Sequence, residues 1–282
     1  MRRFVRRFFG PCFVPVVQEG DVMQLNLDAK TAVVTGASRG IGLATVRTLT
    51  AEGVRVVGAA RTVTPELKET GAHAVAADLS TPDGVAALMD EAFAELGGID
   101  LLVNNVGGGD AVEPGGFLDV DDAAWGSILD VNLMSAVRVT RAALPSLIER
   151  RGSIVNVSSM NARMPAAGPV AYSAAKAALT ALGKSLAEEF GPRGVRVNTV
   201  SPGVTRTAIW EDPDGFGGKM AAAVGVEHAA LLEGMPAAAG ITTGRITEPG
   251  EVAALIAFLL SDVAGNTIGA EYLIDGGSVK AS

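Results

Sequence analysis

The sequence predicts an α/β fold: a doubly wound parallel sheet of the Rossmann type, with about seven strands and helices on both faces. Short β-branched runs alternate with longer helical stretches from Lys30 onward, which is the pattern of repeated strand–helix–strand units. Glycine is abundant at 35 residues, whereas aromatic residues make up only 5%. This balance suits a layered fold with many tight strand-to-helix turns. Right-handed crossovers then place a ligand crevice at the carboxyl ends of the strands.

The first expected strand, residues 31–35, ends in glycines, and residues 41–52 then have helical spacing and stop at Gly53. Six more strands are expected at residues 54–59, 72–77, 99–104, 153–157, 196–200 and 271–274. Further helices are expected at residues 82–96, 121–150, 170–190 and 248–260. No linker or internal repeat divides this run, so residues 23–282 are predicted to form a single domain.

Residues 1–22 differ from the rest of the chain. Four arginines stand there among phenylalanines, and no acidic residue appears before Glu19. Gly10, Pro11 and Pro15 break the apolar stretch, and no small-residue cleavage site follows it, which argues against a targeting peptide. We expect a disordered extension, or a natural start at Met23.

Composition excludes several functions. The chain carries 23 Lys and Arg against 31 Asp and Glu, a net charge of −8 that becomes −10 without residues 1–22, so no basic footprint for nucleic acid is present. The single cysteine, Cys12, cannot form an internal disulfide, which favours a cytoplasmic location over oxidative secretion. With only two histidines, no metal site of the His/Cys type is expected. No apolar stretch reaches the roughly 18–20 residues of a membrane span.

A glycine-rich turn, residues 35–42, follows the first strand and opens the first helix. Gly36 permits a tight turn, Gly40 lets the backbone approach a phosphate, and Gly42 allows close packing of helix on strand. The helix amino end would then face a pyrophosphate with free N–H groups and a favourable dipole. A plain glycine turn is the alternative.

The end of the second strand bears on the choice of nicotinamide cofactor. An acidic residue there would bind the ribose hydroxyls of NAD, but this sequence has Ala60 and Arg61. Arg61 and Arg39 together could clamp a 2′-phosphate, because a guanidinium matches phosphate geometry. We therefore expect NADP(H). If both are ordinary surface arginines, NAD(H) remains possible.

A second constellation consists of Ser159, Tyr172 and Lys176. Ser159 follows the strand at residues 153–157, at the edge where the crevice is expected. Tyr172 and Lys176 are four residues apart on the next helix and so share a face. A neighbouring Lys cation favours the phenolate and is expected to lower the tyrosine pKa. Tyr172 could then exchange a proton with a carbonyl or alcohol oxygen while Ser159 holds that oxygen.

With these motifs, the sequence resembles the short-chain dehydrogenase/reductase family, in its shorter, single-domain branch. The resemblance covers residues 25–277 and includes the family spacing of thirteen residues from Ser159 to Tyr172. It also rests on Asp78, which resembles the family's Asp that contacts the adenine ring, with Leu79, on the segment Asn104, Asn105, Val106 and Gly107, on Asn132, on Pro202, Gly203 and Thr207, and on Asp275, Gly276 and Gly277. Val106 departs from the usual alanine, which puts the position of the adenosine half of the cofactor in question.

The resemblance implies a catalytic group of Asn132, Ser159, Tyr172 and Lys176. In the family, the tyrosine is the acid/base, the lysine lowers its pKa and holds the nicotinamide ribose, the serine polarises the substrate oxygen, and the asparagine holds a water that links the lysine to solvent. The implied cofactor contacts are Gly36, Ser38, Arg39, Gly40, Ile41, Gly42, Arg61, Asp78, Leu79, Asn105, Gly107, Tyr172, Lys176, Pro202, Gly203, Val204 and Thr207.

Residues 204–247 correspond to the family's substrate lid, and their apolar and glycine content suggests a small to medium, partly apolar carbonyl or alcohol substrate. Alternatives are a 3-oxoacyl thioester reductase, an NAD(H)-dependent alcohol dehydrogenase and a non-catalytic NADP-sensing protein. A sugar-nucleotide epimerase or an enoyl reductase fits less well. The resemblance also implies a homotetramer or homodimer, formed through the helices at residues 121–150 and 170–190 and the last strand.

Overall fold

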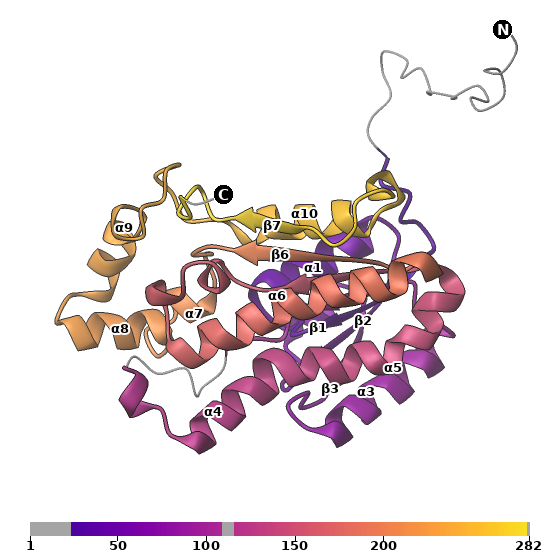
Figure 1. Cartoon of the computed structure of the whole chain (residues 1–282), viewed down its shortest axis with the longest axis horizontal. Coiled ribbons are helices and arrows are strands. Elements are labelled where there is room, and N and C mark those ends of the chain that lie inside the picture. Colours follow the sequence, from indigo (N-terminus) through magenta and orange to yellow (C-terminus); the bar gives the residue numbers. More distant parts are fainter. Residues whose placement is uncertain (1–23, 109–115, 281–282) are drawn as a thin grey trace, which may run out of the picture.

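The computed structural model describes residues 24–108 and 116–280, so the extension expected at residues 1–22 lies outside the described residues. Seven strands form one parallel sheet. They are β1 (Thr31–Thr35), β2 (Arg55–Ala60), β3 (His73–Ala76), β4 (Leu101–Asn104), β5 (Ser153–Val157), β6 (Arg196–Pro202) and β7 (Glu271–Ile274). The order is β3-β2-β1-β4-β5-β6-β7 (Figure 1), so the strand order reverses between β1 and β4. The predicted doubly wound fold is confirmed, and in such sheets a ligand binds outside the carboxyl ends of the strands at that reversal.

Helices cover both faces of this sheet; in Figure 1, α5 and α6 cross in front of it and α1 lies behind. They are α1 (Gly40–Ala51), α2 (Pro65–Lys68), α3 (Pro82–Leu96), α4 (Asp122–Leu129), α5 (Ser135–Arg150), α6 (Val170–Phe190), α7 (Ala208–Glu211), α8 (Phe216–Val224), α9 (His228–Ala238) and α10 (Pro249–Leu260). None of the helices in the described part of the chain is long and apolar enough to cross a membrane.

Strand β1 shows how the two layers share one sheet. Val34 faces the cluster formed with α1 and α10, whereas its neighbour Val33 faces the cluster formed with α3, α5 and α6. Successive side chains of a strand point to opposite faces, so a strand covered on both faces is apolar throughout. All five residues of β1 are accordingly buried.

Several elements begin and end at the predicted residues, and helix α3 shows why. Thr81 caps its amino end by accepting a hydrogen bond from the Gly84 N–H, at 3.1 Å, and Pro82 occupies the first turn. Gly97 ends the helix in the left-handed conformation, with φ +72°. These residues carry the standard start and stop signals of a helix, which a sequence displays directly.

The long helix predicted at residues 121–150 is interrupted. A π-helical turn, Asp130–Met134, separates α4 from α5. Two side chains in this region donate hydrogen bonds to backbone carbonyls. Asn132 Nδ2 donates to the Ile128 carbonyl at 3.0 Å, and Ser135 Oγ donates to the Val131 carbonyl at 2.6 Å. Competition of this kind loosens the regular ladder, and it brings the Asn132 side chain inward, where it is fully buried.

The insertion at residues 204–247 contains three helices, α7 to α9, that were not predicted. Its two ends are tied to each other, because the Thr247 N–H donates to the Val204 carbonyl at 3.1 Å and the Arg206 N–H donates to the Thr247 carbonyl at 2.8 Å. Met160, Met235, Ile241 and other apolar side chains pack beneath it. The segment is therefore an ordered layer over the sheet edge.

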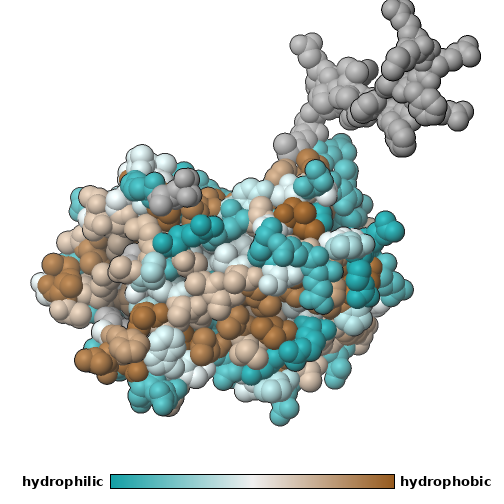
Figure 2. Space-filling view, viewed as in Figure 1, coloured by the Kyte–Doolittle hydropathy of each residue, from teal (hydrophilic) through white to brown (hydrophobic). Residues whose placement is uncertain are grey.

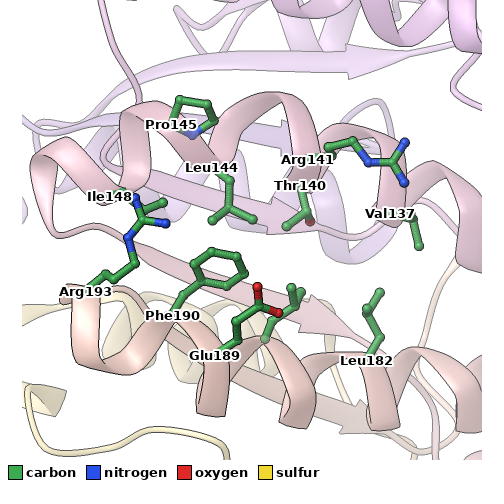
Figure 3. A pocket seen from close by; sticks show the side chains of 11 residues that line it. Val137, Thr140, Arg141, Leu144, Pro145, Ile148, Leu182, Glu189, Phe190 and Arg193 are labelled. Atoms are coloured by element: carbon green, nitrogen blue, oxygen red, sulfur yellow. The ribbon is translucent and has the colours of Figure 1, made fainter.

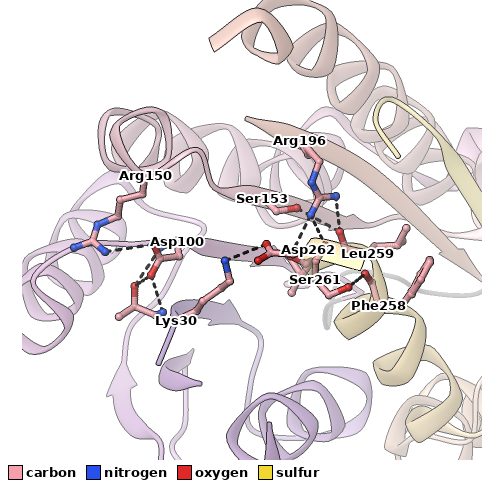
Figure 4. Close-up of polar contacts among 11 residues, drawn as sticks. Lys30, Asp100, Arg150, Ser153, Arg196, Phe258, Leu259, Ser261 and Asp262 are labelled. Carbon is pink, nitrogen blue, oxygen red and sulfur yellow. Dashed lines mark hydrogen bonds and ion pairs between the residues drawn. The ribbon is translucent and has the colours of Figure 1, made fainter. Parts of the chain in front are cut away.

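The opposite edge of the sheet, where the strands begin, carries a set of matched charges (Figure 4). Lys30 Nζ lies 3.1 Å from Asp262 Oδ1, and Arg150 Nη1 lies 3.3 Å from Asp100 Oδ1. Arg196 donates to the carbonyls of Leu259, Leu260 and Ser261 at 2.7 to 3.1 Å. This guanidinium caps the carboxyl end of α10, where a positive charge is stabilising.

Candidate active site

The glycine-rich turn lies at the carboxyl end of β1, and its conformation requires glycine. Gly36 and Gly40 have φ values of +66° and +56°, a region that residues with a Cβ rarely adopt. At Gly42, a Cβ would lie 2.1 Å from the Gly36 carbonyl oxygen. The turn therefore folds back tightly onto the start of α1 and leaves open backbone at the crevice.

The amino end of α1 fits a phosphate group. Arg39 is its N-cap residue and makes no side-chain cap hydrogen bond, so the first N–H groups of the helix have no capping partner from that side chain. These N–H groups and the helix dipole favour an anion. Ile41, in the first turn, is half-buried and packs against the core. The predicted cradle for a pyrophosphate is thus present in the backbone itself.

The turns that carry the two arginines lie side by side. Ser38 Oγ donates to the Thr62 carbonyl, and Thr64 Oγ1 donates to the Ser38 carbonyl at 3.1 Å. Arg39 and Arg61, which follow β1 and β2, are both exposed. Two guanidinium groups on adjacent turns can reach one anionic group at this corner.

Asp78 and Leu79 follow β3, and they differ in which of their groups can face a ligand. The Asp78 carboxylate accepts hydrogen bonds from the Ser80 hydroxyl at 2.7 Å and the Ser80 N–H at 3.0 Å. These bonds hold the pKa of Asp78 below its ordinary value. The Leu79 side chain is buried in the core, so its backbone is the part that can face a ligand.

Asn105 locks the glycine-rich turn rather than pointing away from it. Its Nδ2 donates to the carbonyls of Thr35 and Gly36 at 3.0 and 3.1 Å. The backbone N–H groups of Asn105 and Val106 donate to Thr35 Oγ1 at 2.9 and 3.2 Å. Val106 packs its partly buried side chain against the core, so the larger residue is accommodated away from the turn.

Ser159 and Tyr172 meet at the carboxyl end of β5. Ser159 Oγ accepts a hydrogen bond from the Asn161 N–H at 3.1 Å, and the Ser159 side chain also interacts with the Tyr172 hydroxyl. Burial raises the pKa of Tyr172 above its ordinary value, and the bond with Ser159 offsets part of that rise. Tyr172 is thereby held in its protonated form at neutral pH.

Lys176 lies one turn further along α6 and is almost fully buried, at 2% exposure. Its Nζ donates to the Val157 carbonyl at 2.9 Å and lies 5.7 Å from the centre of the Tyr172 ring. Burial lowers the pKa of Lys176 to about 8. The expected lowering of the tyrosine pKa by this cation is not found, because burial dominates the titration of both groups.

Asn132 holds the turn after β4 in place. Its Nδ2 donates to the Gly108 carbonyl at 3.0 Å, and its Oδ1 accepts from the Gly108 N–H at 2.8 Å. A Cβ at Gly107 would lie 2.6 Å from Lys176 Nζ and 3.2 Å from Asn132 Oδ1. Only glycine therefore lets this turn pass against both side chains. Sequence patterns do not reveal the parts played by Gly108 and Val157, because both act through their backbones.

The segment after β6 closes the site from the other side. Pro202 is the last residue of β6, and a Cβ at Gly203 would lie 2.7 Å from the Asp275 Cα. Val204 turns its side chain into the apolar cluster beneath the insertion. A Cβ at Gly40 would lie 3.0 Å from the Thr207 methyl, so this segment reaches across to the glycine-rich turn. The predicted residues from all these strand ends are thus brought to one edge.

Two further residues lie elsewhere. His228 Nε2 lies 2.7 Å from the Trp210 carbonyl and ties α9 to α7, and His73 pairs with Glu91 at the outer strand β3. Among residues 24–108 and 116–280, no group of His, Cys, Asp or Glu side chains could hold a metal ion.

Comparisons with known proteins define the class. The family described as short chain dehydrogenase matches residues 30–214. The chain belongs to the short-chain dehydrogenase/reductase family and is an NAD(P)-dependent oxidoreductase that acts on alcohol or carbonyl groups.

Individual relatives differ in substrate. The chain is 34% identical over 265 residues to the 3-oxoacyl-(acyl-carrier-protein) reductase FabG of Vibrio cholerae, covering 90% of this chain and 98% of that protein. It is 37% identical over 262 residues to the cis-4-hydroxycyclohexanecarboxylate dehydrogenase of Sinomonas cyclohexanicum, covering 88% and 96%. The L-sorbose reductase of Gluconobacter frateurii, solved with NADPH and L-sorbose, superimposes with a TM-score of 0.84 at 31% identity, covering 92% and 100%.

Proposed function

We propose that this protein transfers hydride between NADP(H) and a small to medium, partly apolar carbonyl or alcohol compound, with Asn132, Ser159, Tyr172 and Lys176 as its catalytic group. The observation that carries the proposal is that Ser159 and Tyr172 interact at the carboxyl edge of the sheet, with Lys176 one helical turn away. Such a pair can bind one substrate oxygen from two directions.

The roles of the four residues follow from their contacts. The bound nicotinamide supplies or accepts the hydride. In reduction, the protonated Tyr172 hydroxyl donates its proton to the substrate oxygen while Ser159 Oγ holds that oxygen. Lys176 is positioned by the Val157 carbonyl to bind the ribose and to pass a proton toward Tyr172. Asn132 fixes the turn at Gly108. Because Asn132 also lies near Lys176, it suits the proton relay of the family.

The preference for NADP(H) rests on Arg39 and Arg61. Both are exposed beside the cradle, where the ribose of the adenosine half would lie. We expect Arg39→Ala and Arg61→Ala each to raise the Kd for NADPH about tenfold, as for the loss of one charge-assisted hydrogen bond, and to leave the Kd for NADH within about twofold. Fluorescence titration of the two reduced cofactors measures this. Equal effects on both cofactors would contradict the assignment.

The substrate region is proposed to be the insertion at residues 204–247, acting as a lid. Trp210 and Phe216 pack edge to face, with ring centres 5.5 Å apart, and Ile209 lies against Gly108 beside the catalytic group. These side chains exclude water from the crevice and favour a substrate with an apolar part.

A 3-oxoacyl thioester reductase is the second candidate, favoured by the 34% identity to the Vibrio cholerae enzyme. A panel of ketones, sugars, cyclic alcohols and a 3-oxoacyl thioester, assayed with each cofactor, distinguishes the two. Preference for the thioester would select the second candidate, and preference for NADH would make the protein an NAD(H)-dependent alcohol dehydrogenase. Cofactor binding without turnover on any compound would indicate an NADP-sensing protein.

A homotetramer or homodimer in the cytoplasm completes the proposal. Apolar side chains gather over α5 and α6 (Figure 2), and between these helices lies a groove of about 540 Å³ (Figure 3). Leu144 and Ile148 line it from α5, and Leu182 and Phe190 from α6. A second copy of the chain would bury this surface. Sedimentation equilibrium gives the number of chains.

A further inference from the structure

Arg138, in the first half of α5, is hydrogen-bonded to two segments that lie in different parts of the proposed site. Its Nη2 donates to Asp130 Oδ1 at 2.7 Å, and its Nη1 donates to the Ser80 carbonyl at 2.7 Å. The side chain is only 20% exposed. The fork of a guanidinium allows one side chain to bind two acceptors in fixed directions at once.

Each of the two acceptors belongs to a different half of the cofactor site. Ser80 is the residue whose N–H and hydroxyl bind the Asp78 carboxylate, so its carbonyl lies in the turn proposed to meet the adenine. Asp130 begins the π-helical turn that contains Asn132, the residue that holds Gly108 beside Lys176. Arg138 is thus the hydrogen-bonded connection between the two.

We propose that Arg138 is a positioning residue that fixes the adenine turn relative to the π-helical turn, so that one bound cofactor contacts both at the correct spacing. The inference rests on the proposed function, since it assumes that the cofactor lies along this edge. The two hydrogen bonds of Arg138 hold the two turns at a fixed spacing. Loss of either bond leaves the mostly buried guanidinium partly unsatisfied, which is more disruptive than the loss of a surface ion pair.

The test compares Arg138→Met with the matched control Arg150→Met. Arg150 lies on the same helix and loses one ion pair, with Asp100, but at the amino edge of the sheet. Calorimetry with 2′,5′-ADP measures the adenosine half alone, and steady-state kinetics with NADPH measures kcat and KM. We expect Arg138→Met to raise the Kd for 2′,5′-ADP and to lower kcat, each three- to tenfold, while Arg150→Met leaves both within twofold.

Two milder variants act on the two turns that Arg138 joins. Ser80→Ala keeps the carbonyl but removes the hydroxyl bond to Asp78, and we expect it to raise the Kd for 2′,5′-ADP with kcat unchanged. Asp130→Asn weakens the hydrogen bond of Arg138 to the other turn, and we expect it to lower kcat with the Kd for 2′,5′-ADP unchanged. In the double variant of Arg138→Met with Asp130→Asn, kcat falls no further than in Arg138→Met alone. Arg138→Lys retains the charge and replaces the methionine variant in the test if that variant folds poorly. We expect it to restore only one of the two hydrogen bonds of Arg138.

The outcomes are distinct. Wild-type protein that neither binds 2′,5′-ADP nor turns over any carbonyl with NADPH would overturn the proposed function, and this inference with it. Wild-type binding and turnover, with Arg138→Met and Arg138→Lys indistinguishable from wild type or from Arg150→Met, would overturn the inference alone. A variant that changes only the melting temperature also overturns it, because a purely structural role moves stability and not the two ligand-specific constants.

Discussion

At the amino edge of the sheet, the charged side chains drawn in Figure 4 meet groups that match them, whereas the carboxyl edge buries a charge with little compensation. Arg196 at the first edge donates to several carbonyls at the end of α10. Lys176 at the second donates to one carbonyl, that of Val157, and within the described residues it has no carboxylate partner. Arg196 is half-buried on β6 and Lys176 is buried on α6, and the two cations differ in how many acceptors their donors meet.

The difference separates a stabilising edge from a reactive one. The pKa of a guanidinium lies far above neutral pH, so Arg196 stays charged and serves to hold elements together. Burial lowers the pKa of Lys176 to about 8, close enough to neutrality for the group to gain and lose a proton. Functional sites commonly sacrifice stability in this way.

The largest effect is expected at the reactive edge itself. Tyr172→Phe removes the only proton that the proposed mechanism gives to the substrate oxygen, so turnover should fall by about 10³-fold or more. Cofactor affinity should stay within about threefold of wild type, because the phenylalanine keeps the aromatic ring of Tyr172. Steady-state rates and a binding titration measure the two quantities. Near-normal turnover in this variant would remove Tyr172 from its proposed role.

Arg196→Met tests the stabilising edge. The variant leaves several carbonyls at the end of α10 without their donor, and we expect a loss of about 3 kcal/mol in the free energy of unfolding, with kcat within twofold per folded molecule. Urea unfolding and kinetics check this. Arg196→Lys, which retains the charge and part of the hydrogen bonding, should lose less. A loss of activity at unchanged stability would contradict the separation of the two edges.

Lys176→Met should raise the free energy of unfolding, whereas Arg196→Met should lower it. Burial lowers the pKa of Lys176 from 10.5 to about 8, so the unfolded chain binds more protons than the folded one between these values. The wild-type penalty, about 3 kcal/mol at about 1.36 kcal/mol per unit, is complete below pH 8 and disappears above pH 10.5.

Allowing about 1 kcal/mol for the Val157 carbonyl left without its donor, we expect Lys176→Met to be about 2 kcal/mol more stable than wild type at pH 7. Wild-type stability relative to the variant should rise with pH through the window from 8 to 10.5. Urea unfolding at pH 7, 9 and 10.5 checks both the sign and the window. A variant that is less stable than wild type at pH 7 would show that Lys176 is better satisfied than its contacts indicate.

The smallest effect is expected for Lys30→Met. Its ion pair with Asp262 joins side chains that are 30% and 61% exposed, and exposed pairs contribute about 0.5 kcal/mol or less. Thermal unfolding at low and high salt measures it. A loss above about 1 kcal/mol would mean that the amino edge acts as a coupled network rather than as separate pairs.

Much of this molecule could be predicted from its sequence because the decisive signals are local. Thr81, Pro82 and Gly97 mark the ends of α3 within a few residues of the helix they bound, and the apolar runs of the strands mark the sheet. The glycine-rich turn and the pair Tyr172 and Lys176 are likewise short motifs. Each of these can be recognised from neighbouring residues alone, without any long-range contact.

What could not be predicted depends on contacts between distant residues. The π-helical turn at Asp130–Met134 follows from side chains of Asn132 and Ser135 that take backbone carbonyls, which periodicity does not reveal. The pKa of Tyr172 was expected to fall under the influence of Lys176, but burial of both groups outweighs that attraction. Helix α7 has only four residues, α8 contains Gly217 and Gly218, and α9 contains Pro236. Glycine and proline are weak helix formers, so these helices were not predicted.

One feature of the insertion bears on how this scaffold diversifies. Residues Val204 and Arg206 at its start are hydrogen-bonded to Thr247 at its end, so forty residues of chain leave and rejoin the body at nearly one point. Closing a longer or shorter loop there changes the conformational entropy only slightly. The part of the segment beyond Thr207 can therefore be lengthened, shortened or exchanged while the sheet stays unchanged, which makes this single junction the natural place to graft a new substrate specificity.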